Sequence, residues 1–341
     1  MAVGELPMIL FTVISQMCVG AFVVLGLVQT VGGVRYSSKV VDRLADPALF
    51  ALGPAMVAGL VASMFHMHDV TNTFNVVRHW ESSWLSREIV FGVGFAGLGF
   101  LFFLLQVLKI GSAVLRRVLA VVTALFGIGL VVSQVMIYYS LVTVPAWSSW
   151  ATWVQFFGTA LLLGALAVGM AFVLVIGRRE GRLVGSQVAV GSQVAVGAGA
   201  GGSYGQRLRD FFADRQVDDS RTSAEVAELM VGSVRGCVVG AVLVAGVLLV
   251  AMPVYVSGLA GLGEVGLVSA AHYGTGFAVV RFGLLALGVF LLGVMAFYYA
   301  GFGTKKLRTL GFLMVCSFVL VFVGELMGRS LFYEAMTRVG V

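Results

Sequence analysis

The chain has 341 residues, of which 60% are hydrophobic and 11% are charged, and its mean hydropathy is +1.02. So apolar a composition excludes a water-soluble globular protein of this length and predicts an integral membrane protein. The formal net charge of +6 requires no nucleic-acid partner, because basic loops on one side of a membrane account for it.

Eight stretches are apolar and long enough to cross a hydrocarbon core as helices, judged over a window of about 19 residues. These predicted spans are residues 6–31, 47–67, 89–108, 118–141, 150–176, 231–256, 277–299 and 310–332. The sequence therefore predicts an all-α integral membrane protein in which residues 1–341 form one bundle of eight transmembrane helices. Because Glu5 stands where a signal peptide carries basic residues, we expect the first span to be retained.

The basic residues predict the orientation of the bundle. Of the 22 lysines and arginines, 17 lie in or beside the segments that join spans 1 to 2, 3 to 4, 5 to 6 and 7 to 8. The positive-inside rule places these segments in the cytoplasm, so both termini are expected outside. The longest of them, residues 177–230, contains a hexapeptide at 184–189 that is repeated at 190–195, and we expect a flexible cytoplasmic linker there.

Two prolines carry expectations about helix ends. Asp46 followed by Pro47 is the pattern of an N-cap and a first-turn proline, which predicts that the second span begins there. Pro253, with the glycines that follow it, is a weak indication of a break in the sixth span.

The three cysteines, Cys18, Cys237 and Cys316, are far apart and lack the close spacing of iron–sulfur or zinc ligands. No predicted span has a histidine in its middle, where a membrane haem requires one. We therefore expect no metal site, haem or iron–sulfur cluster in this chain, and any electron-transfer metal must lie on a partner.

Ionisable residues gather at the predicted outer side. They are His66, His68, His79, His272, Glu88, Arg281, Glu325 and Arg329. Two aromatic residues are expected on the same side: Tyr138 near the outer end of span 4, and Trp147 between spans 4 and 5. A charged group within a span costs roughly 2.5–3.5 kcal/mol at mid-membrane, so such residues usually face the bundle interior. The pattern predicts that several helices direct titratable groups toward one outer region.

Simpler roles remain open for each of these residues. Glu325 and Arg329 are spaced i,i+4 and can form an ion pair on a helix surface. Glu88 can interact with the dipole at the start of span 3, and His66 can be an interfacial residue at a helix end. Tyr138 and Trp147 can belong to the aromatic belt of a membrane protein.

The residue types suit the oxidation of a quinol. This reaction needs a site reached from the bilayer, an apolar or aromatic wall, and acceptors for two protons; His66 and Glu88 can serve as acceptors. A proton-coupled secondary transporter can use the same residue types, although it favours inverted repeats and charges at the midplane. The chemistry alone therefore leaves two classes of function.

Several segments, in order from the first span to the last, resemble the DmsC family, the membrane anchor subunit of dimethyl sulfoxide reductase. They are Ile9-Leu10-Phe11-Thr12-Val13, Ala62-Ser63-Met64-Phe65-His66, Phe74-Asn75, Leu85-Ser86-Arg87-Glu88-Ile89, Tyr138, Thr143-Val144-Pro145-Ala146-Trp147 and Gly324-Glu325-Leu326-Met327-Gly328-Arg329. The chain departs from the family pattern at Met136, where an arginine is expected, and at Val142, where an acidic residue is expected.

The resemblance implies a multi-pass anchor in the cytoplasmic membrane of a prokaryote that oxidises menaquinol in anaerobic respiration and holds no redox centre. It implies that electrons pass to an iron–sulfur subunit and then to a molybdopterin catalytic subunit, both docked on the outer face.

In that family a histidine and a glutamate tied to quinol binding and oxidation match His66 and Glu88. Tyr138 and Trp147 are then expected as walls of the site, with charged surroundings from Arg281, Glu325 and Arg329. The anchor of another molybdopterin oxidoreductase is an alternative within the same class.

Overall fold

The computed structural model describes residues 5–64, 78–189 and 220–339. Its longer helices are α1 (Leu6–Arg35), α2 (Ser38–Met64), α4 (Trp84–Leu108), α5 (Ala113–Tyr139), α6 (Trp150–Ala189), α8 (Ser220–Ala260) and α12 (Leu307–Glu334). The shorter ones are α9 (Gly263–Ala271), η3 (His272–Gly274), α10 (Gly276–Leu285), η4 (Ala286–Gly293), α11 (Val294–Ala300) and η5 (Gly303–Lys306). Within the described residues the protein is all-helical, which confirms the predicted fold class.

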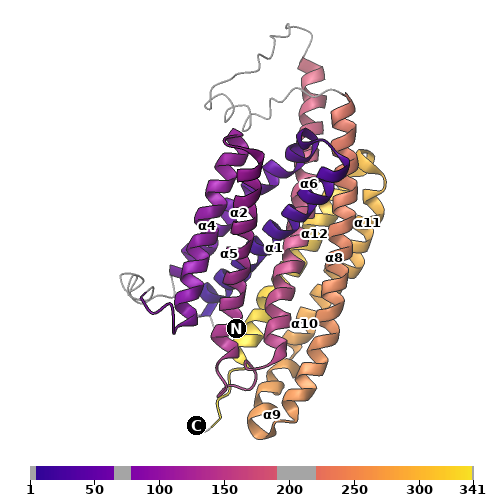
Figure 1. The fold of residues 1–341 in the computed structure, drawn as a ribbon. Helices are drawn as coiled ribbons and strands as arrows, with labels where there is room; N and C mark the ends of the chain where they lie inside the picture. Colours follow the sequence, from indigo (N-terminus) through magenta and orange to yellow (C-terminus); the bar gives the residue numbers. More distant parts are fainter. Residues whose placement is uncertain (1–4, 65–77, 190–219, 340–341) are drawn as a thin grey trace.

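Eight helical segments of the described residues are long and apolar enough to cross a membrane, as the sequence predicted. They run up and down in one elongated bundle, and both termini lie at the same end, called here the termini end (Figure 1). Large apolar side chains such as Val118, Val121 and Leu125 of α5 are exposed on the outside, as expected for a surface that faces lipid. The protein is a multi-pass membrane protein.

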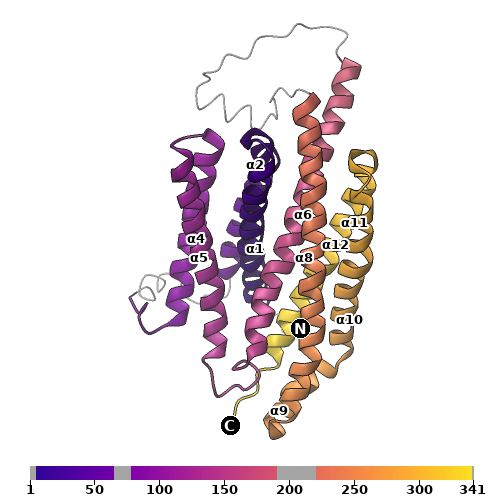
Figure 2. The ribbon, with the colours of Figure 1, turned by 45° about the vertical axis from the view of Figure 1, so that its right-hand side comes forward.

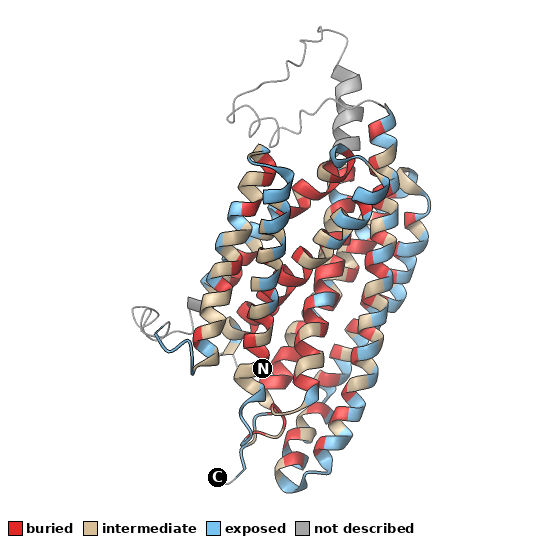
Figure 3. Ribbon diagram, in the orientation of Figure 1, coloured by how far each residue is buried: buried red, intermediate tan, exposed pale blue. Residues whose placement is uncertain are grey.

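Helices α1 and α6 form the middle of the bundle. Helix α1 packs against α2 and α6, α6 packs against α8, and α4 and α5 form a pair at one side (Figure 2). Buried residues are concentrated along α1 and α6 (Figure 3). At the crossing of these two helices a Cβ on Gly20 would collide with the Ala160 carbonyl, and a Cβ on Gly164 would collide with the Gly20 backbone. The two backbones therefore touch, as small residues allow between helices in lipid.

Helix α2 begins at Ser38, nine residues before the predicted start, so the expectation that Asp46 and Pro47 cap it is wrong. Pro47 lies inside the helix, as does Pro54. The first turns of α2 carry two charged residues, Asp42 and Asp46. Both accept hydrogen bonds from the ammonium group of Lys109, at 2.6 and 3.1 Å. The ion pairs neutralise these charges, whereas a hydropathy window counts each charged residue against a membrane span.

The two long helices beside the predicted linker extend into it. Helix α6 continues to Ala189 and α8 begins at Ser220, so residues 177–189 and 220–230 are helical. Residues 190–219, which include the second hexapeptide copy, lie outside the described residues. Helix α8 also continues through Pro253, so the break suggested by that proline is not present.

The seventh span is continuous but changes helix type. It runs from Gly276 to Ala300 and contains the π-helical segment η4 between α10 and α11. Backbone hydrogen bonds in a π-helix run between residues i and i+5, and Ser317 of α12 adds a hydrogen bond from its hydroxyl to the Gly288 carbonyl at 2.7 Å. The irregular segment is thus supported by its neighbour.

We predict that Gly20→Ala destabilises the protein by about 1–3 kcal/mol, because the added methyl group overpacks the contact between α1 and α6. Gly26→Ala is the control on the same helix, since a Cβ there meets nothing within 4 Å and the change gains up to about 1 kcal/mol in helix propensity. Thermal unfolding in detergent measures both variants. Equal stability of the two would contradict the assigned backbone contact.

Candidate functional site

The sequence-predicted site residues are found at one end of the bundle wherever the structure describes them. Glu88 lies at the start of α4, Tyr138 near the end of α5, and Trp147 just before α6. Arg281 lies on α10, with Glu325 and Arg329 on the last turns of α12. His66 and His68 lie outside the described residues. The described candidates therefore come from different helices and meet at the termini end.

The start of α4 is fixed by local interactions. The Ser83 hydroxyl oxygen accepts a hydrogen bond from the Ser86 amide at 3.3 Å, a standard N-cap. The Arg87 guanidinium stacks on the Trp84 ring at 4.0 Å and donates to the Trp80 carbonyl at 2.9 Å. Arg87 is thus held by the preceding turn. The neighbouring Glu88 side chain is partly buried, and its hydrogen-bond partner is Gln134 of α5.

Two buried glutamines connect Glu88 with Arg329. The Arg329 guanidinium donates to the Gln16 amide oxygen at 2.9 Å, and the Gln16 amide nitrogen donates to the Gln134 oxygen at 3.0 Å. The Gln134 amide nitrogen in turn donates to the Ser15 hydroxyl at 3.0 Å and faces the Glu88 carboxylate. Every amide in this series donates toward the carboxylate, so the network runs from a cation to an anion.

A second set of contacts surrounds Glu325. One carboxylate oxygen lies 3.9 Å from Nη2 of Arg281, and the other is hydrogen-bonded to the Thr159 hydroxyl of α6. The Glu325 and Arg281 side chains are each 2% exposed, so the pair is buried. A Cβ on Gly328 would collide with the Arg281 guanidinium, so this glycine provides the space that the arginine occupies.

These contacts contradict the alternative in which Glu325 and Arg329 form an ion pair on a helix surface. Both residues are buried, and Glu325 pairs with Arg281 of another helix. The Arg329 guanidinium instead lies 3.6 Å from the centre of the Phe156 ring, in a cation–π contact. Tyr273 lies in η3, just before the seventh span. Burial raises the pKa of its hydroxyl, and the Arg281 charge opposes this rise only in part.

Aromatic side chains close the site at the termini end. The Tyr138 and Trp147 rings meet edge to face at 5.0 Å between centroids, and the Trp147 ring stacks on Phe332 at 5.7 Å. The Trp147 indole donates to the Phe332 carbonyl at 2.7 Å, and the Tyr138 hydroxyl donates to that of Tyr333 at 3.2 Å. Trp147 is thus buried and holds the segment between α5 and α6 against α12, whereas Tyr138 is partly exposed.

Sequence reasoning missed Gln16 and Gln134, which connect Arg329 with Glu88, and Thr159, which is hydrogen-bonded to Glu325. A signal for them was present, because an amide side chain inside an apolar span is costly unless it finds a hydrogen-bond partner. Among the described residues no group of three or more His, Cys, Asp or Glu is arranged to hold a metal ion. The arrangement can accept a proton at Glu88 and stabilise negative charge near two buried guanidinium groups.

A family model described as DMSO reductase anchor subunit (DmsC) matches residues 1–335 of the sequence. The protein is 35% identical over 162 residues to the C chain of the anaerobic dimethyl sulfoxide reductase of Escherichia coli (strain K12), a match that covers 48% of this sequence and 55% of the relative. It is 30% identical over 179 residues to the protein of the same name from Haemophilus influenzae, covering 52% and 62%.

A third relative is the YnfH chain of an anaerobic dimethyl sulfoxide reductase of Escherichia coli (strain K12), which is 29% identical over 162 residues, covering 48% of this sequence and 55% of the relative. The protein thus spans between 55% and 62% of the length of the curated relatives it matches.

We predict that Arg281→Met destabilises the protein by about 3–5 kcal/mol, because it leaves the buried Glu325 carboxylate without its cation. The double variant Arg281→Met/Glu325→Gln removes both charges and should recover much of that loss. Unfolding in detergent measures both. Arg338→Met, at an exposed arginine, is the control and should behave like the unmodified protein. A double variant as unstable as Arg281→Met would contradict the claim that the pairing of Arg281 with Glu325 stabilises the protein.

Proposed function

Because the protein belongs to the DmsC family of DMSO reductase anchor subunits, we propose that it oxidises quinol in a dimethyl sulfoxide reductase-like complex. Its substrate is menaquinol, and its setting is the cytoplasmic membrane of a prokaryote in anaerobic respiration. The names of the relatives support the type of complex. The single observation that carries the chemistry is the Glu88 carboxylate, joined through two glutamines to Arg329 at the termini end.

Oxidation of one quinol releases two protons and two electrons. Glu88 and His66 are the proposed acceptors of the two protons, in keeping with the general-base chemistry of carboxylate and imidazole. Gln134 holds the Glu88 carboxylate by a hydrogen bond, and the Glu88 side chain is partly exposed, so the carboxylate is oriented and a quinol hydroxyl is proposed to approach it from its exposed side. Glu88 is thereby a proposed catalytic residue on a rigid helix.

The guanidinium groups of Arg281 and Arg329 are proposed to act as positioning residues. Each is buried, and Glu325 neutralises one positive charge of the pair. The remaining positive charge favours negative charge in its neighbourhood, both on Glu88 and on a quinol that is losing a proton. Tyr138 is the proposed partly exposed wall of the site.

The electrons are proposed to leave for an iron–sulfur partner subunit and then for a molybdopterin catalytic subunit. The termini end is the proposed docking face, since Glu88 lies there and the positive-inside rule places that end outside. Protons released there enter the same compartment in which the acceptor is reduced. The reaction is therefore expected to contribute little to a proton gradient.

We predict that Glu88→Gln reduces quinol-linked acceptor reduction at least about 100-fold, because general-base catalysis contributes about 10²–10⁴-fold and an amide cannot take up the proton. Activity with an artificial donor should stay unchanged, since the partner subunits are untouched. Glu81→Gln is the matched control, because this exposed carboxylate lies at the same end of the bundle. Full quinol activity in Glu88→Gln would exclude Glu88 as the acceptor.

A second prediction concerns the complex. The tagged protein purified in mild detergent should bring molybdenum and iron with it, and the preparation should oxidise a menaquinol analogue. His66→Ala should keep both metals and lose the oxidation. Metal analysis and the oxidation assay measure the two properties separately. A lone, metal-free protein from cells that express the whole complex would contradict the anchor function.

A further inference from the structure

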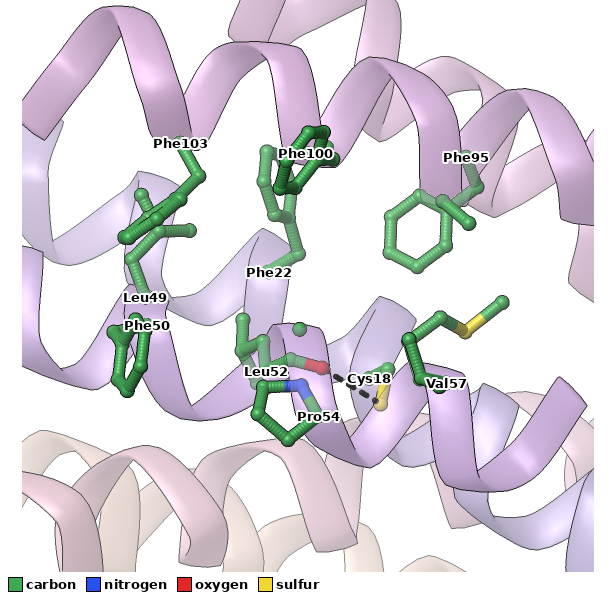
Figure 4. A pocket seen from close by; sticks show the side chains of 14 residues that line it. Cys18, Phe22, Leu49, Phe50, Leu52, Pro54, Val57, Phe95, Phe100 and Phe103 are labelled. Carbon is green, nitrogen blue, oxygen red and sulfur yellow. Dashed lines mark hydrogen bonds between the residues drawn. The ribbon is translucent and has the colours of Figure 1, made fainter. Parts of the chain in front are cut away.

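An apolar cavity of about 410 Å³ lies between α1, α2 and α4 (Figure 4). Phenylalanine rings form much of its wall, from Phe22 of α1 to Phe95, Phe100 and Phe103 of α4. Its size falls in the ~300–1,000 Å³ range of small-molecule sites. No charged side chain contributes to its lining, so its occupant there must be apolar.

The cavity exists because small or bent positions face each other across it. Gly53 and Pro54 of α2 lie on one side, and Ala96 and Gly99 of α4 lie on the other. A Cβ on Gly53 would meet nothing within 4 Å. Side chains too small to fill the space between two helices leave room that another apolar molecule can occupy.

The cavity opens toward the side of the bundle. Its deep wall contains Phe95, which is 5% exposed, and Phe22, whose ring contacts Phe95 edge to face at 5.8 Å. Its rim contains Val57 and Phe100, which are 58% and 63% exposed. The exposed rim faces the surface that carries apolar side chains, so a molecule dissolved in the bilayer can enter laterally.

One stripe of α4 connects the cavity with the proposed catalytic carboxylate. Glu88, Gly92 and Phe95 are spaced i, i+4, i+7 and therefore lie on one face of the helix. Phe95 is about 10 Å from Glu88 along the helix axis, at the 1.5 Å rise of an α-helix. Gly92 lies between them, and Leu130 of α5 packs against it. Because the cavity and Glu88 are this close on one helix, a molecule whose polar end meets Glu88 can place its apolar part in the cavity.

We propose that the cavity binds the isoprenoid tail of the quinol whose head group is oxidised at Glu88, an inference that rests on the proposed function. A phospholipid fits less well, because the Glu88 carboxylate repels a phosphate but accepts a hydrogen bond from a quinol hydroxyl. The cavity then selects quinols by the length of their tail and positions the head group.

The test compares two glycine variants of the intact complex. Gly53→Leu places a side chain in the cavity. Gly97→Leu is the matched control, because Gly97 also is exposed, has nothing within 4 Å of an added Cβ, and does not line the cavity. The substrates are menaquinol with a long isoprenoid tail and menadiol, which has the same ring system without the tail.

We expect Gly53→Leu to lower kcat/KM for the long-tailed quinol about tenfold, since displacing about two methylene groups from an apolar site has this effect. The rate with menadiol should be unchanged, and Gly97→Leu should match the unmodified complex with both substrates. The tail site would be overturned if Gly53→Leu and Gly97→Leu gave the same ratio of kcat/KM for the long-tailed quinol to kcat/KM for menadiol.

A quinone analogue with a photoreactive group on its tail tests binding without turnover. Crosslinks within residues 49–57 or 95–103, lost in Gly53→Leu and kept in Gly97→Leu, would support the site. Crosslinks that long-tailed menaquinone does not compete away, but phospholipid does, would assign the cavity to lipid and overturn the proposal. If the unmodified complex oxidises neither quinol yet reduces its acceptor from an artificial donor, the proposed function itself fails.

Discussion

The burial of two guanidinium groups among apolar helices is the constraint on which the termini end of this bundle depends. A charge removed from water is tolerated only where the protein itself supplies partners. Arg281 pairs with the Glu325 carboxylate at 3.9 Å and fits beside Gly328, while Arg329 donates to Gln16 and lies over the Phe156 ring. These partners come from several helices, so the contacts of the two arginines constrain how those helices are placed.

That placement links stability with the proposed chemistry. Gln16 is engaged by Arg329 and in turn engages Gln134, which reaches Glu88 on the peripheral α4–α5 pair. A carboxylate at the edge of the bundle is therefore oriented by a network that begins in its centre. Catalytic groups need such support, because a side chain held by packed neighbours keeps its geometry when substrate arrives. Gln16 lies on α1, whose backbone contacts that of α6 directly.

Helix α4 carries both halves of the proposed quinol site. Its first turns present the polar group that can accept a proton, and the same face farther along contributes phenylalanine rings to an apolar cavity. A quinol has this same division into a polar ring and an apolar tail. The proposed proton acceptor and the proposed tail site therefore both lie on α4, at different depths in the membrane.

The sequence by itself determined the eight apolar spans, the all-helical class and the family, because hydropathy and short motifs are local properties of the chain. It also indicated that Glu88, Arg281, Glu325 and Arg329 belong to one end. Only the tertiary structure decided that α2 begins at Ser38, that Glu325 pairs with Arg281 across helices, and that two glutamines join Arg329 to Glu88. Each of these depends on which side chain of a distant segment lies opposite, and helical spacing along one span contains no information about its neighbour.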